Sequence, residues 1–96
     1  MNRYEVQKTL NAHRDRLAEL DIRSLSLFGS VARGESRDDS DVDLLVEFSR
    51  PVGLFHFART QRELSNILGR PVDLATPGAL KPALRERILK ESVRAA

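Results

Sequence analysis

The sequence predicts a small two-layer α/β (α+β) domain, built on a mixed sheet of three strands or slightly more with helices on one face. Short segments alternate apolar and polar residues as strands do, longer segments between them show helical spacing, and glycines and prolines separate the two kinds. The chain has 96 residues, of which 41% are hydrophobic and 31% charged. We therefore expect residues 1–96 to form a single domain with one modest core.

Four helices are expected. The first covers residues 4–20, the second is a short helix over 30–33 that ends at Gly34, and the third covers 54–68. The last helix runs from the Pro77-Gly78 turn to about residue 93. The residues of the third helix predicted to face inward are Leu54, Phe57, Ala58, Leu64, Ile67 and Leu68. All four phenylalanines are interpreted as core residues: Phe28, Phe48, Phe55 and Phe57.

The three predicted strands cover residues 24–28, 41–48 and 71–75. Alternation along the second strand places its apolar residues on one face and Asp41 and Asp43 on the other. In the third strand Asp73 points away from the face of its apolar neighbours. Helices should cover the apolar face, so the face with the three aspartates should stay partly open.

These three aspartates predict a cation site. Strands are depleted in aspartate, and burying a carboxylate without a partner costs free energy. A hard divalent cation such as magnesium compensates for that cost, because it prefers a few carboxylates together with phosphate oxygens. Asp41 and Asp43 can bind the same ion from one strand, and Asp73 can close the site from another. Ordinary solvated or ion-paired carboxylates are the alternative.

The Gly29-Ser30 turn between the first strand and the short helix predicts a phosphate site. Glycine lets a ligand approach the backbone closely. The start of a helix offers free N–H groups and a positive dipole end, and Ser30 adds a hydroxyl. Ser30 as a simple helix N-cap is the alternative. Arg33 and Arg37 are interpreted as solvated, while Asp38 and Asp39 should add negative potential in the loop.

Two other phosphate- and metal-binding motifs fail at single residues. The run GSVARGES is similar to a Walker A loop, but Glu35 stands where that loop requires lysine. An EF-hand loop beginning at Asp39 would have Leu44 where glycine is needed and Arg50 where the bidentate glutamate belongs. Gly29-Ser30 followed ten residues later by Asp41-Val42-Asp43 is a more specific pattern than either.

That pattern resembles the polymerase-β-like nucleotidyltransferase superfamily. The segment LFGSVARGESRDDSDVDLLVEF, with GRPVDLATPGAL and the basic segment after it, is similar to the minimal nucleotidyltransferases of that superfamily. The resemblance implies that Asp41, Asp43 and Asp73 are the catalytic carboxylates and that they bind two magnesium ions. It also implies that Gly29 and Ser30 hold the phosphates of ATP.

Minimal nucleotidyltransferases are often paired with HEPN-type RNase toxins. The resemblance therefore implies a HEPN-type toxin as partner, with transfer of AMP to that toxin as the antitoxin activity. Two alternatives stay open: an antitoxin that acts by stoichiometric binding without essential catalysis, and a transferase that acts on RNA or a small molecule. RNA is the less favoured partner, because the basic C-terminal helix lacks the aromatic residues that RNA readers use.

Composition excludes several other classes. The chain has no cysteine, which excludes a disulfide scaffold, a thiol nucleophile and a zinc–thiolate site. It also has no signal-peptide pattern at its start and no apolar run near the ~20 residues that span a bilayer. We therefore expect a cytoplasmic protein with no membrane partner.

Overall fold

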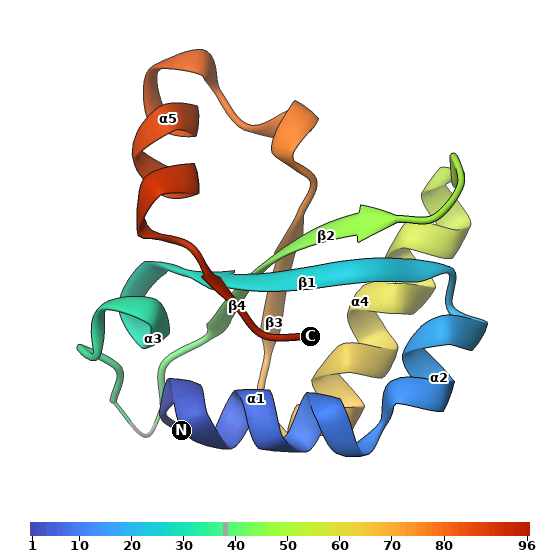
Figure 1. The fold of residues 1–96 in the computed structure, drawn as a ribbon, viewed down its shortest axis with the longest axis horizontal. Helices are drawn as coiled ribbons and strands as arrows, with labels where there is room; N and C mark the ends of the chain where they lie inside the picture. The colour runs from blue at the N-terminus through green and yellow to red at the C-terminus, as the bar shows by residue number, and fades with distance from the viewer. Residues whose placement is uncertain (38) are drawn as a thin grey trace.

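The computed structural model describes residues 1–37 and 39–96 and contains a four-stranded sheet with helices packed around it (Figure 1). Its elements in chain order are α1 (Arg3–Ala12), α2 (Arg14–Glu19), β1 (Ile22–Phe28), α3 (Gly29–Arg33), β2 (Val42–Phe48), α4 (Leu54–Leu68), β3 (Val72–Ala75), the 3-10 helix η1 (Pro77–Ala79), α5 (Pro82–Glu91) and β4 (Val93–Arg94).

The sheet is mixed, with strand order β3-β2-β1-β4. β1 pairs antiparallel with both β2 and β4, whereas β2 pairs in parallel with β3. The parallel pair follows from the connection, because α4 carries the chain back along the sheet between the two strands, as a parallel crossover requires. The predicted mixed α/β architecture is confirmed, and the sheet is one strand larger than the three segments that alternation identifies.

The core lies on the face of the sheet that alternation predicts. Val42, Leu44 and Val46 of β2 are all fully buried there. Apolar side chains from α1, α2 and α4 complete the cluster, among them Leu10 and Leu64. These three helices lie along one side of the molecule, while α5 lies on the opposite side, beside α3 and β1 (Figure 1).

The N-terminal helix is two helices rather than the single one predicted over residues 4–20. His13 ends α1 and precedes α2 with non-helical backbone angles. Its side chain contacts the Thr9 carbonyl at 2.8 Å, and its N–H donates to the Leu10 carbonyl. Leu10 and Leu17 are both buried on either side of this break. Because they are seven residues apart, the same spacing also fits one straight helix, so periodicity cannot detect the break.

The first turn of α4 is exposed, contrary to the prediction. Leu54 is 79% exposed and Phe55 is 92% exposed, and Ala58 is exposed as well. β3 pairs with β2 only as far as the Leu45–Ala75 pair. Beyond that pair β3 no longer runs beside β2, and only β1 continues the sheet there.

The last helix ends two residues earlier than predicted. α5 stops at Glu91, and residues 93–94 form β4 against β1. The pairing is extended by the N–H of Ala95, which donates to the Leu25 carbonyl at 2.8 Å. A two-residue strand is too short to show alternation, so only the folded sheet shows it. Across residues 1–37 and 39–96, the structure has no helix long and apolar enough to cross a membrane.

Candidate active site

The turn at the end of β1 is built around Gly29. Phe28 is extended, and Gly29 then takes a left-handed φ of +71° as the first residue of α3. Val31 and Ala32 are buried and anchor this short helix to the sheet. Because α3 begins at Gly29, Ser30 is its second residue, and the interpretation of Ser30 as N-cap is wrong.

Gly29 lies against Asp43. The sheet register pairs Phe28 with Asp43, which places the turn beside this carboxylate. A Cβ added to Gly29 would clash with Asp43 Oδ2. Any side chain there would have to displace the Asp43 carboxylate and would be strained by the positive φ. The predicted turn and the second predicted aspartate are thus in direct contact.

Asp43 also pairs with Asp73. The two residues are register partners in the parallel β2–β3 pair, so both side chains lie on the face opposite the core. Asp43 is half-buried, and Asp73 is exposed. Burial raises the pKa of Asp43 above its ordinary value, and the nearby charges of Asp73 and Asp41 raise it further. The Arg33 guanidinium opposes this rise. The site therefore concentrates negative charge that a cation would neutralise.

Asp41 is exposed and precedes the first residue of β2. In the described part of the chain, no group of three or more His, Cys, Asp or Glu side chains is close enough to hold a metal ion as it stands. Asp43 and Asp73 therefore share one face of two neighbouring strands and Asp41 lies just before β2, without the three converging on one point. The donor set still suits a hard divalent cation, because it consists of carboxylates beside a backbone turn that lacks a side chain.

Two further side chains adjoin the site. Arg33, interpreted from sequence as solvated, donates to Glu35 Oε2 at 3.0 Å and to Glu91 Oε1 at 3.3 Å. Glu91 was not predicted, because it lies in a basic helix and only the β4 pairing brings it to the site. Arg37 and Asp39 are exposed, in line with their interpretation, whereas Asp38 lies outside the described residues.

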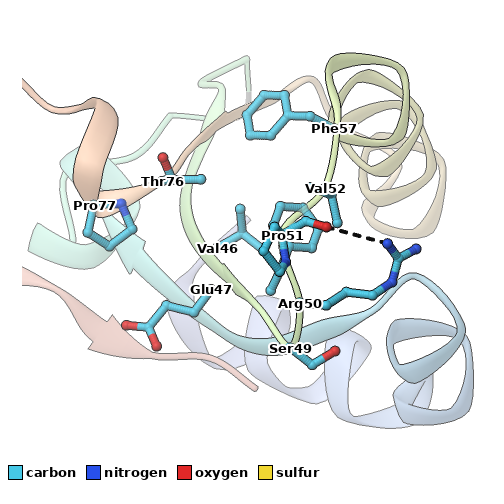
Figure 2. Close-up of a pocket in the computed structure, with 10 residues that line it drawn as sticks. Val46, Glu47, Ser49, Arg50, Pro51, Val52, Phe57, Thr76 and Pro77 are labelled. Carbon is cyan, nitrogen blue, oxygen red and sulfur yellow. Dashed lines mark hydrogen bonds between the residues drawn. The ribbon is translucent and has the colours of Figure 1, made fainter.

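One surface hollow lies away from these aspartates, and none of the predicted site residues lines it. It has a volume of about 550 Å³ and is formed where β2 continues past the end of β3 (Figure 2). Val46, Phe57 and Thr76 lie around it, next to the exposed first turn of α4. Asp43 and Asp73 are near the opposite ends of these strands, so the size of this hollow does not make it the catalytic centre.

The Gly-Ser turn lies against Asp43, and Asp73 is beside Asp43 on the next strand, as expected for a nucleotidyltransferase site. Residues 10–95 match the nucleotidyltransferase domain family, and the chain belongs to this family. Membership of this family confirms the predicted nucleotidyltransferase activity. Members of the family generally use divalent metal ions.

Similar proteins place the chain near the minimal members of the family. The protein adenylyltransferase MntA of Thermococcus cleftensis is 38% identical over 90 residues, which cover 93% of this chain and 91% of that protein. A solved structure of a minimal nucleotidyltransferase has a TM-score of 0.80 and 38% identity, covering 97% of this chain and 95% of the other.

The fold also matches a structure of a tri-AMPylated HEPN toxin of Shewanella oneidensis in complex with its MNT antitoxin. The TM-score is 0.67, and the match covers 95% of this chain and 71% of the other. The identity is 17%, so this likeness concerns the fold alone.

Proposed function

We propose that this chain is a magnesium-dependent adenylyltransferase that moves AMP from ATP to a HEPN-type RNase toxin and thereby acts as its antitoxin in the cytoplasm. The observation that carries the proposal is the contact between the Gly29 turn and Asp43, with Asp73 beside Asp43 in the sheet register. The name of the Thermococcus relative and the AMPylated toxin in the Shewanella complex support the choice of acceptor.

In this proposal the backbone around Gly29 and the Ser30 hydroxyl bind the β- and γ-phosphates of ATP. The absence of a side chain at Gly29 lets those phosphates approach Asp43. Asp41 and Asp43 would hold two magnesium ions, with Asp73 helping to hold the catalytic one. The bound ions supply charge neutralisation for the attacking and leaving oxygens.

The transfer itself needs one proton acceptor. A hydroxyl oxygen of the partner attacks the α-phosphorus of ATP, the bond from that phosphorus to the bridging oxygen breaks, and pyrophosphate leaves. Asp73 takes the hydroxyl proton; as an exposed strand carboxylate it can reach an acceptor that a partner presents. Most of the rate enhancement then comes from positioning and from stabilisation of charge.

Labelled ATP tests this proposal. The chain is incubated with magnesium, ATP labelled at the α-phosphate and the protein product of the neighbouring gene, and label on that protein is measured. The Asp41→Asn, Asp43→Asn double variant should lose at least about 100-fold in rate, the scale of removing transition-state charge stabilisation. The Asp15→Asn, Glu86→Gln double variant removes the same charge from exposed positions and should keep the wild-type rate.

Rescue of cells from the toxin separates catalysis from binding. If the Asp41→Asn, Asp43→Asn variant has no transferase activity and still protects as well as the wild type, stoichiometric binding is the antitoxin mechanism. Label on RNA or on a small molecule instead of the partner protein would identify a different acceptor.

A further inference from the structure

Glu91 is held beside the proposed phosphate site by β4. It is the last residue of α5, and only Ser92 separates it from the strand. Val93 pairs with Leu27 in the sheet, and the Leu25 N–H donates to the Ala96 carbonyl at 3.1 Å. The end of α5 is therefore fixed next to the end of β1, where Gly29 begins its turn.

The Glu91 carboxylate contacts the turn directly. The Gly29 N–H donates to Glu91 Oε1 at 3.2 Å, and Arg33 Nη1 lies 3.3 Å from Oε1 and 3.4 Å from Oε2. The Glu91 side chain is only 20% exposed. An internal anion thus holds a backbone donor and a guanidinium that face the Asp43 side of the site.

Glu91 also adds negative charge where the site already has an excess. Its charge contributes to the raised pKa of Asp43, together with burial, Asp73 and Asp41. A triphosphate is itself an anion and would require the same Gly29 N–H. A carboxylate and a phosphate cannot both accept this hydrogen bond, and the two negative groups would repel each other if both lay beside the Gly29 N–H.

We propose that Glu91 is an internal competitor of the nucleotide, whose carboxylate holds the Gly29 N–H and Arg33 until the triphosphate displaces it. This inference rests on the proposed function of the Gly29 turn. Glu91 then sets nucleotide affinity, because only the fraction of molecules with the carboxylate displaced can bind.

The surroundings of Glu91 allow this displacement. α5 has no buried residue, and Leu84 and Leu89 are 45% and 41% exposed. A hollow of about 220 Å³ lies between Phe28, Ile88 and Glu91, so space exists beside the carboxylate. Because α5 packs shallowly, a small rotation of its last turn disrupts few apolar contacts.

Nucleotide binding to Glu91 variants tests the inference. The probe is magnesium α,β-methylene-ATP, which cannot release pyrophosphate, and its Kd is measured by calorimetry. The Glu91→Ala variant should bind about 3–10-fold more tightly than wild type, which corresponds to a displaced fraction of roughly a third to a tenth. Glu91→Gln should tighten binding less, because its amide oxygen can still accept the Gly29 hydrogen bond.

Glu86 provides a matched control on the same helix. Its side chain is 81% exposed and pairs with Lys90 on the solvent side. Glu86→Ala and Glu86→Gln change the net charge by the same amount as the Glu91 variants. They should leave the Kd for the probe within about twofold of wild type, because a distant exposed charge is screened. In NMR spectra of the nucleotide-free protein, Glu91→Ala should shift the Gly29 amide resonance, and Glu86→Ala should leave it unchanged.

Unchanged or weaker binding by both Glu91 variants, with measurable binding by wild type, would overturn the inference and leave the proposed function intact. Weaker binding would instead place Glu91 among the residues that support the nucleotide. If neither the wild type nor any variant binds the probe, the proposed function itself fails. Thermal unfolding identifies a variant that does not fold; in that event Glu91→Gln, which keeps the side-chain shape, decides the outcome alone.

Discussion

Gly29 is constrained at the level of a single residue in two independent ways. Its φ of +71° strains any side chain, and a Cβ would meet Asp43 Oδ2. Gly29→Ala should therefore destabilise the fold by roughly 2–4 kcal/mol, combining left-handed strain with overpacking, and should abolish transfer. Urea unfolding and the labelled-ATP assay measure the two effects.

Gly34 separates these two causes. It also has a positive φ, +75°, but a Cβ there meets nothing within 4 Å. Gly34→Ala should cost only the strain, about 1–2 kcal/mol, and should retain activity. Equal losses in the two variants would mean that the contact with Asp43 has no effect.

Asp43 predicts a pH dependence of stability in the absence of divalent ions. Its pKa is raised in the folded chain, so the unfolded chain releases this proton at lower pH. Stability from this group is therefore lost as pH rises from the ordinary aspartate range through the raised folded pKa. Asp43→Asn should unfold a few degrees above wild type at pH 7 in EDTA, and this difference should vanish toward pH 3.

Thermal unfolding at several pH values measures this effect. Glu47→Gln, at an exposed residue of the same strand, is the control and should match wild type. A lower unfolding temperature for Asp43→Asn than for wild type at pH 7 would contradict the assignment of burial and repulsion to Asp43.

At the scale of elements, α4 is buried against the core at Leu64 and exposed at its start. Leu64 is fully buried, and Leu54 is 79% exposed on the same helix. Leu64→Ala should cost about 2–5 kcal/mol, because it removes core contacts and leaves a cavity. Leu54→Ala should stay within about 0.5 kcal/mol of wild type. Urea unfolding of the two variants compares the same substitution at two positions, and a large loss in Leu54→Ala would show that this turn packs.

Alternation predicts the faces of β2 and β3 correctly. Val42 and Leu44 are buried, and Asp43 and Asp73 share the other face. Periodicity depends only on neighbours in sequence, so it identifies strands long enough to repeat. It misses the two-residue β4, and it cannot show that Leu54 stays exposed.

At the scale of the whole molecule, divalent cations should stabilise the folded chain. Ions that bind only the folded state add stability in proportion to the logarithm of their concentration, about 2.7 kcal/mol at 100 times Kd. Raising magnesium in the presence of α,β-methylene-ATP should therefore raise the unfolding temperature of wild type. Asp41→Asn, Asp43→Asn should show no such rise, and an equal rise in both proteins would place the cation elsewhere.

The sequence by itself determined the fold class and the strand faces, because these depend on local alternation, and its spaced motif predicts the site residues Gly29, Ser30, Asp41, Asp43 and Asp73. The tertiary structure decided which of these residues touch. The β1–β2 and β2–β3 registers place the Gly29 turn and Asp73 beside Asp43. Only the tertiary structure brings Glu91 to the Gly29 turn, because strand pairing between residues far apart in sequence leaves no local pattern.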